Sequence, residues 1–365
     1  MTQCPRRQLQ ADTVANMTTA IHRVFISLAL FAALPMLAMH EDHPEHAAPP
    51  PSGTWKTGDL QWTVVPDWGQ HEDLTIGSTH GGVVIDAQGR VLYNTDTAHG
   101  TLVHSADGGH IGNLAPQFPG LHGMQLRTED GTPYLYGAHL PGKQVVKLRM
   151  DGTHVWTLGV PMESGKYDDN PKAYNPTAVA IAPDGRIYVA DGYGRNWIHV
   201  FGPDLRYRKS FGGPGSQEGQ FHTCHGLGID ESGESPLLVV CDRENRRLQT
   251  FTLDGVHVDT PATGLMRPCS IAFWTSPNGS RIAAVAELEG RITILDGNWN
   301  TVGHIGFNDD PQQRARHGIP PQEWKPGVTT APHGIGFDAQ GNLYVQDWNA
   351  HGRVHKFIQM PATAQ

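Results

Sequence analysis

Short stretches in which apolar and polar residues alternate recur along the chain from Gly81 onward. Each copy contains an alternating run, a turn with Asp, Asn or Gly, and a second run rich in β-branched and aromatic residues. A third run follows in several copies, as in WIHVFG and RRLQTFTLDG. There are six copies, and they begin at Gly81, His122, Thr177, His225, Cys269 and His333.

The spacing of these copies predicts the architecture. Successive copies begin 41, 55, 48, 44 and 64 residues apart, which fits four-stranded units joined by loops of variable length. No segment shows a competing helical period. We therefore expect an all-β, six-bladed β-propeller over residues 58–360. The segment LQWTVV (Leu60–Val65) is expected to add the outer strand that closes the last blade against the first.

Composition agrees with many turns and argues against one class of partner. The 365 residues include 43 Gly and 27 Pro, which favours turns over long helices. The 27 Lys and Arg against 36 Asp and Glu give a net charge of −9, and the basic residues form no dense run. Binding to nucleic acid is therefore disfavoured, because it requires a basic surface to neutralise phosphates.

The N-terminal residues do not follow the repeat. Val24–Ala38 is an apolar run that follows His22–Arg23 and is short for a membrane span, which is typical of a signal-peptide core. We expect a signal peptide over residues 1–39, with Met17 as an alternative start, and a disordered linker rich in His and Pro over residues 40–57. The protein is then expected to be a periplasmic or extracellular monomer without a membrane anchor; a retained anchor is the alternative.

Cysteine usage adds little to this picture. Loss of Cys4 with the leader leaves Cys224, Cys241 and Cys269, which have no CxxC spacing. At most one disulfide can form within the chain. We interpret the three as small buried residues.

Histidine occupies the first position of copies two, four and six. The innermost strand of each blade lines the channel of a propeller, so His122, His225 and His333 are expected about 120° apart around the axis. Three neutral imidazoles with an open fourth position are typical of a catalytic zinc site, although other divalent transition metals also accept imidazole. The alternatives are three unrelated core histidines, or a site that also includes the thiolate of Cys224 or Cys269.

With these motifs in place, the chain resembles the peptidyl-α-hydroxyglycine α-amidating lyases, or peptidylamidoglycolate lyases, over roughly residues 81–357. The matching phrases are LHGMQL, CHGLGID, APHGIGF, NPTAVAIAPDGRIYVADGY and VVCDRENRRLQTF. The resemblance implies a secreted six-bladed propeller in which His122, His225 and His333 hold zinc. It also implies that Tyr193 is the catalytic tyrosine and Arg243 a catalytically implicated arginine. The wider NHL-repeat propellers share the blade pattern without the histidines.

The chain departs from this family at several positions. The family has a further catalytic arginine after the second strand of the first blade, where this chain has Asn94 and Thr95. Ala331 replaces a methionine, and Gly334 replaces an acidic residue that serves a structural calcium, so we expect no calcium at that position. Neither family disulfide is reproduced. These departures indicate a diverged member.

The candidate residues support a definite chemistry. Tyr193 beside a metal cation is suited to act as a base, and Arg243 is suited to hold a carboxylate. The structural alternatives are that Tyr193 only packs a turn and that Arg243 only pairs with Asp242 or Glu244. The acids that recur at the end of the second strand are interpreted as acceptors of backbone hydrogen bonds in the turns: Asp191, Asp242 and Asp347.

Three functions remain open at this point. The first is a zinc-dependent lyase acting on a small or peptide-derived carbinolamide. The second is a non-catalytic propeller that binds a peptide, a glycan or a protein partner. The third is a metal-dependent hydrolase such as a lactonase, although carboxylate-rich calcium ligands, typical of such sites, are missing from the predicted ring.

Overall fold

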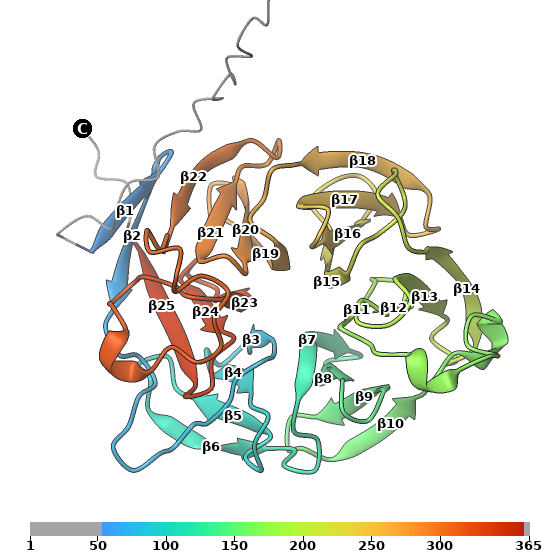
Figure 1. The fold of residues 1–365 in the computed structure, drawn as a ribbon, viewed down its shortest axis with the longest axis horizontal. Coiled ribbons are helices and arrows are strands. Elements are labelled where there is room, and N and C mark those ends of the chain that lie inside the picture. Colours follow the sequence, from blue (N-terminus) through green and yellow to red (C-terminus); the bar gives the residue numbers. More distant parts are fainter. Residues whose placement is uncertain (1–52, 361–365) are drawn as a thin grey trace, which may run out of the picture. The chain divides into compact units, whose positions relative to one another are not determined.

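Six antiparallel sheets surround a central axis in the structure, a computed structural model that describes residues 53–360 (Figure 1). All of these residues lie within the compact unit Pro44–Gln365. The six-bladed propeller of four-stranded blades is thereby confirmed. The predicted leader lies outside the described residues. Among those described, no helix has the length and apolar character needed to cross a membrane.

In each blade the strands follow one another along the chain from the axis outward, except that β2 and β1 lie outside β25 in blade 6. Blade 1 comprises β3 (Val83–Ile85), β4 (Val91–Asn94), β5 (Thr101–His104) and β6 (His110–Leu114), and blade 2 comprises β7 (Leu121–Glu129), β8 (Thr132–His139), β9 (Gln144–Arg149) and β10 (His154–Leu158). Blade 3 comprises β11 (Ala178–Ile181), β12 (Ile187–Ala190), β13 (Trp197–Phe201) and β14 (Tyr207–Gly212), and blade 4 comprises β15 (Cys224–Asp230), β16 (Leu237–Asp242), β17 (Arg247–Thr252) and β18 (His257–Ala262). Blade 5 comprises β19 (Pro268–Thr275), β20 (Arg281–Glu287), β21 (Arg291–Leu295) and β22 (Thr301–Ile305), and blade 6 comprises β23 (Pro332–Phe337), β24 (Leu343–Asp347), β25 (Arg353–Met360), β2 (Leu60–Val65) and β1 (Thr54–Thr57). The helices in the described part are three short 3-10 turns, η1 (Met162–Ser164), η2 (Pro171–Ala173) and η3 (Pro321–Glu323).

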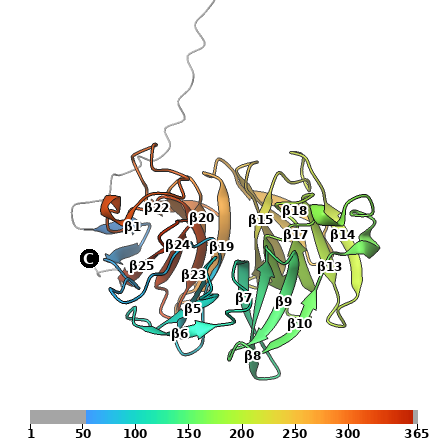
Figure 2. The ribbon, with the colours of Figure 1, turned by 60° about the horizontal axis from the view of Figure 1, so that its bottom comes forward.

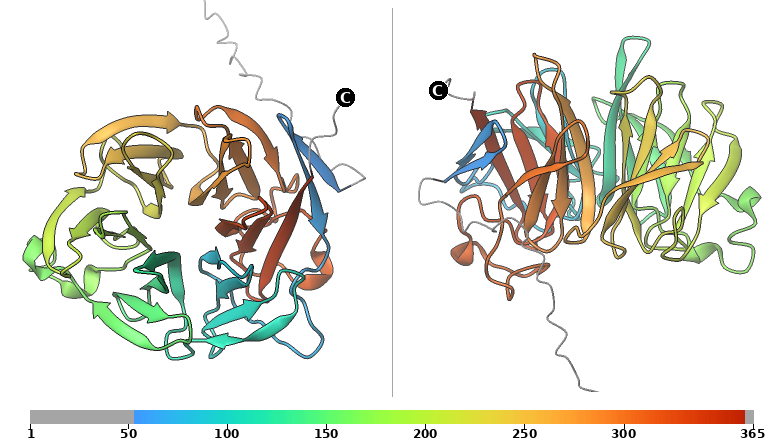
Figure 3. Two further views of the ribbon diagram at one scale, coloured as in Figure 1. Left: turned by 180° about the vertical axis from the view of Figure 1, so that it is seen from behind. Right: turned by 90° about the horizontal axis from the view of Figure 1, so that it is seen from above.

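The innermost strands coincide with the six sequence copies. Each begins within two residues of the position where its copy begins. These strands surround the axis in Figure 1, and the tilted view labels four of them, β7, β15, β19 and β23 (Figure 2). The strands of every blade run from one face of the propeller to the other (Figure 3). Residues at the start of each inner strand therefore meet near one end of the central channel.

Blade 6 joins the two ends of the described chain. Strand β2 pairs with β25 from Gln61 opposite Met360 to Val65 opposite Lys356, as predicted for this segment, and lies beside it in Figure 1. Strand β1 extends the sheet further, so the fold begins at Thr54 and not at residue 58. The reason is Trp55, whose side chain is only 5% exposed and packs edge-on against Phe357.

Apolar clusters fill the space between neighbouring blades. The second strand of each blade has both faces covered, and β12 (IYVA) is buried at all four positions. Tyr188 of blade 3, for example, packs in one cluster with Leu238 of blade 4. The three cysteines, Cys224, Cys241 and Cys269, are buried and form no disulfide within residues 53–360, as expected for small core residues.

A glycine after each ring histidine lets the inner strands approach closely. A Cβ atom at Gly226 would lie 2.3 Å from the carbonyl oxygen of Cys269 in the next blade. The equivalent distance is 2.6 Å for Gly123 and 2.5 Å for Gly334. Because backbone atoms cannot move aside as a flexible side chain can, only glycine fits these positions.

This packing predicts that Gly226→Ala destabilises the fold by about 1–3 kcal/mol, the usual cost of inserting a methyl group into a packed site. The matched control is Gly112→Ala in β6, where a Cβ atom would meet nothing within 4 Å and where alanine is expected to be neutral or stabilising. Urea unfolding of the two variants and the wild type measures the difference. Equal stability of the two variants would contradict the packing argument.

Candidate active site

The three predicted ring histidines meet at the channel axis. His122, His225 and His333 are 2%, 1% and 3% exposed. Their ring centroids are 4.7 Å apart for His122 and His225, and 4.6 Å apart for each of the other two pairs. Three blades that are distant in sequence thus contribute one imidazole each to a single cluster.

Each ring histidine is fixed by a hydrogen bond from Nδ1 to a backbone carbonyl of the next blade. The accepting carbonyls belong to Thr177, Cys269 and Gly81, at 2.6, 2.7 and 3.4 Å from His122, His225 and His333 respectively. These acceptors are the ring positions of the intervening blades. Because a carbonyl can only accept, Nδ1 carries the hydrogen and Nε2 keeps a lone pair.

Those lone pairs are buried and mostly unpartnered. Among the described residues, Nε2 of His122 and Nε2 of His333 have no hydrogen-bond partner. Burial lowers the pKa of all three imidazoles well below the ordinary value, so they are neutral. Buried polar atoms without a partner are rare, and neutral imidazole nitrogen is the form that binds zinc-class metals. The three residues therefore fit a metal site.

Two further residues bring potential ligand atoms into the cluster. His80, His122 and His333 form one set and His225, Cys269 and His333 a second, and within each set the ligand atoms all lie within 4.8 Å of one another. Cys269 was among the candidate ligands predicted from the sequence, whereas His80 was not. The signal was present in the sequence, since His80–Gly81 repeats the His–Gly dipeptide of the ring copies one residue out of alignment.

Tyr193 and Arg243 lie together against His225. The Tyr193 hydroxyl donates to His225 Nε2 at 2.9 Å, and Arg243 Nη1 donates to the Tyr193 oxygen at 3.1 Å. Burial raises the pKa of Tyr193 to about 12, and the Arg243 guanidinium opposes that rise. Arg243 also donates from Nε to Glu244 at 2.9 Å, so the pairing considered as an alternative is present as well.

Asn94 and Thr95 do not supply a polar group to the cluster. Both side chains are fully buried at the end of β4. Asn94 Nδ2 donates to the Gly100 carbonyl at 3.3 Å and to Thr101 Oγ1 at 3.2 Å. These two residues therefore stabilise the end of the blade.

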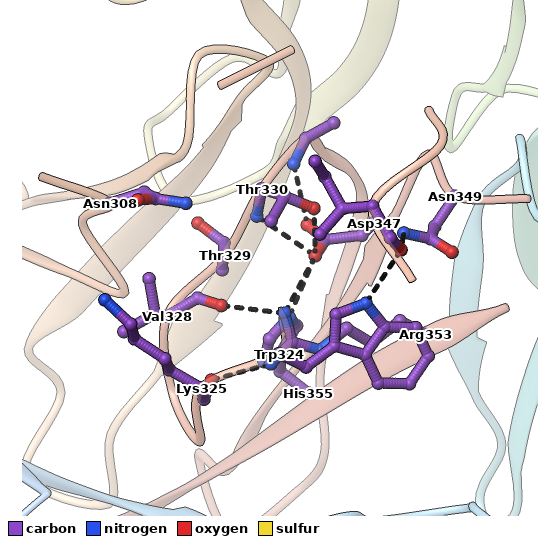
Figure 4. A network of polar contacts seen from close by, with 12 residues as sticks. Asn308, Trp324, Lys325, Val328, Thr329, Thr330, Asp347, Asn349, Arg353 and His355 are labelled. Carbon is purple, nitrogen blue, oxygen red and sulfur yellow. Dashed lines mark hydrogen bonds and ion pairs between the residues drawn. The ribbon is translucent and has the colours of Figure 1, made fainter. Parts of the chain in front are cut away.

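The repeated acids hold the segments that lead into the inner strands of blades 3 to 6. Asp347 accepts from the backbone N–H groups of Thr330 and Ala331, each at 3.1 Å, and is itself held by Arg353 and His355 (Figure 4). This fixes the segment that leads into β23 and His333. In blades 3, 4 and 5 the corresponding acid–backbone pairs are Asp191 with Asn175, Asp242 with His222 and Glu287 with Met266. The acids act as acceptors of backbone hydrogen bonds, as expected, but chiefly from the segment that precedes the inner strand.

The cluster lies between a cavity and two aromatic side chains. On the channel side of the histidines lies a cavity of about 60 Å³ lined by side chains such as Met124, Leu227 and Ile335. On the opposite side lie Tyr193 and Trp348, on loops that follow the second strands. A substrate that contacts Tyr193 therefore approaches from that loop face.

Comparison with known proteins agrees with the fold and the resemblance. Residues 174–201 match the NHL repeat. Over 160 residues the chain is 29% identical to the probable peptidyl-alpha-hydroxyglycine alpha-amidating lyase of Caenorhabditis elegans, a match that spans 43% of this chain and 43% of that relative's length. The resemblance to this lyase family, with an NHL repeat and a six-bladed propeller, is thus confirmed.

Solved structures share the propeller at low sequence identity. A streptogramin B lyase superposes with a TM-score of 0.54 at 13% identity, over 84% of this chain and 100% of the other. A gluconolactonase from Xanthomonas campestris superposes with a TM-score of 0.56 at 14% identity, over 84% of this chain and 91% of the other. At such identities the likeness concerns the fold alone.

The geometry predicts that the purified protein binds close to one zinc-class metal ion per chain. A chelator that removes the ion is expected to lower the melting temperature, because a ligand bound only by the folded state stabilises that state. Elemental analysis and thermal melts before and after chelation measure both quantities. Metal-free protein that melts at the same temperature with and without added zinc would argue against the site.

Proposed function

We propose that the protein is a zinc-dependent carbon–nitrogen lyase that cleaves a carbinolamide of the α-hydroxyglycine type into an amide and glyoxylate. One observation carries the proposal: the Tyr193 hydroxyl is hydrogen-bonded both to His225, one of three ring histidines, and to Arg243. A group able to transfer a proton is thereby within hydrogen-bond reach of the atoms that would hold the metal.

His122, His225 and His333 are the proposed zinc ligands. Support comes from their neutral state, their fixed Nδ1–H tautomer and the unpartnered Nε2 atoms of His122 and His333. Other divalent transition metals also accept imidazole. When bound, such an ion polarises an oxygen of the substrate and favours the anionic form of a nearby phenol.

Tyr193 is the proposed base. The lone pair of His225 Nε2 accepts the Tyr193 O–H hydrogen bond and is the same pair that a metal would use, so the phenol would face the substrate once His225 serves as a ligand. Tyr193 would act in its phenolate form, with its own proton released to solvent beforehand. The phenolate oxygen takes the proton of the carbinol hydroxyl. The electron pair of that O–H bond becomes the second bond of the new carbonyl, and the C–N bond breaks with its electron pair on the amide nitrogen. Tyr193 returns the proton to that nitrogen, so atoms and charge balance.

Arg243 has a supporting role in this step. Two of its nitrogens already donate, Nε to Glu244 and Nη1 to Tyr193. A guanidinium held against the phenol oxygen stabilises negative charge there when the proton leaves. Binding of a substrate carboxylate is then left to the N–H bonds of Arg243 that neither Glu244 nor Tyr193 accepts. Arg243 is therefore proposed to stabilise the phenolate and also to orient the substrate.

We also propose that this activity takes place outside the cytoplasm, in a monomer released by cleavage of the signal peptide. The support is the apolar run Val24–Ala38 and its short length. The proposed substrate class is a small or peptide-derived carbinolamide, supported by the similarity to a probable peptidyl-alpha-hydroxyglycine alpha-amidating lyase.

The proposal predicts that Tyr193→Phe lowers turnover by roughly 100-fold or more while zinc content stays unchanged, since only one hydroxyl is lost. Tyr207→Phe is the matched control, because Tyr207 lies on the outer strand β14 and its hydroxyl contacts Ser210. Glyoxylate release from an N-acyl-α-hydroxyglycine by the zinc-loaded full chain measures turnover. Background-level release from the wild type and both variants, with zinc bound, would reject the lyase and favour a binding propeller.

A further inference from the structure

A fourth histidine belongs to the cluster although it stands outside the ring positions. The ring centroid of His80 lies 4.7 Å from that of His122 and 4.7 Å from that of His333. These two distances are close to the 4.6–4.7 Å spacing among the ring histidines themselves. The next residue, Gly81, has no side chain, and a Cβ atom there would lie 2.5 Å from the Leu121 carbonyl oxygen. Blade 1 therefore places the imidazole of His80 near the axis, whereas blades 3 and 5 have no histidine at their ring positions.

His80 is held differently from the other three imidazoles. Each ring histidine is buried and donates from Nδ1 to a backbone carbonyl. His80 is half-buried, and its one hydrogen bond within residues 53–360 joins Nε2 to the Tyr193 hydroxyl at 3.5 Å. A hydrogen bond of that length is weak. The imidazole of His80 is thus close to the metal-binding atoms and weakly restrained.

We propose that His80 is a fourth imidazole ligand of the metal, and that it is the ligand a substrate oxygen displaces. This inference rests on the metal site of the proposed function. Zinc is most often four-coordinate, so three ring histidines leave one position for a further donor. His80, His122 and His333 bring their ligand atoms within 4.8 Å of one another, which fits a shared ion, and His225 is linked to them through His333 in the second set.

Cys269 is the competing fourth donor, and its surroundings favour His80. The Cys269 sulfur lies 3.7 Å from the Arg267 carbonyl, to which it donates, and its side chain is 1% exposed. A ligand that exchanges with substrate has to face the side from which substrate arrives. His80 lies on that side, with its ring 5.7 Å from that of Trp348 and 6.2 Å from that of Tyr193.

His317 offers a matched control on the same face. Its Nε2 lies 3.2 Å from Ser78 Oγ, and its ring lies 4.9 Å from that of Trp348. It belongs to neither set of residues with converging ligand atoms. Loss of His317 thus removes a neighbouring imidazole without removing a proposed ligand.

The test uses the full chain loaded with Zn(II). X-ray absorption counts the scatterers, and the wild type and His317→Ala are expected to show four imidazole nitrogens at about 2.0–2.1 Å, whereas His80→Ala shows three and an oxygen. Competition with a chelator is expected to show Zn(II) binding at least tenfold weaker for His80→Ala than for the wild type. The reason is that even the loss of an outer-shell partner typically weakens metal binding roughly 10- to 100-fold. His317→Ala is expected to bind as the wild type does.

The outcomes separate this inference from the proposed function. Three imidazoles and unchanged affinity in both the wild type and His80→Ala would overturn the role of His80 and leave the three-histidine site intact. A sulfur scatterer at about 2.3 Å in the wild type would assign the position to Cys269 and also overturn it. No zinc in the wild type would overturn both proposals. His80→Gln, which keeps a polar side chain, replaces His80→Ala if the metal-free alanine variant melts below the metal-free wild type.

Discussion

The hydrogen bond from each ring histidine to the next blade is the interaction on which the site depends. It is possible because Gly123, Gly226 and Gly334 allow the inner strands to approach within the reach of an imidazole. The bond ties blades 2, 4 and 6 to blades 3, 5 and 1. The same bond places the imidazole hydrogen on Nδ1. One contact therefore joins two neighbouring blades and leaves Nε2 with a lone pair. The stability of the fold and the affinity of the proposed metal site would therefore depend on the same three residues, through Nδ1 and Nε2 respectively.

The acids at the ends of the second strands supply the second constraint. Asp347 fixes the backbone two and three residues before His333, and Asp242 does the same for the segment before His225. Because the charge of each acid is used by backbone N–H groups and basic neighbours, it is not free to coordinate an ion at the axis. The two kinds of side chain thus have different roles: the carboxylates accept hydrogen bonds from the loops, and the neutral imidazoles face the channel.

The sequence predicted the features that repeat and missed those that do not. The six inner strands follow from alternation of apolar and polar residues, and the ring position of His225 follows from aligning the copies. His80 was not predicted as a ligand because it lies one residue before the aligned ring position, which Gly81 occupies. Strand β1 escaped because its four residues carry only one strong signal, Trp55, whose partner Phe357 lies at the other end of the chain.

The partners of Arg243 were also beyond sequence reasoning, since they depend on how three blades meet. Glu244 accepts from both Arg243 and Arg267, so one carboxylate is shared between two guanidinium groups. Positive charge thus exceeds negative charge beside Tyr193 even before any metal ion is considered. A divalent cation among neutral imidazoles would increase that excess, and burial strengthens its effect because nearby water is scarce. The electrostatics of the site therefore favour anions: a deprotonated Tyr193 and a substrate that carries a carboxylate. Under the proposed function, both acidic and neutral carbinolamides would gain from a deprotonated Tyr193, but only an acidic one would also gain from direct attraction to Arg243, so the surroundings of Arg243 would favour acidic substrates.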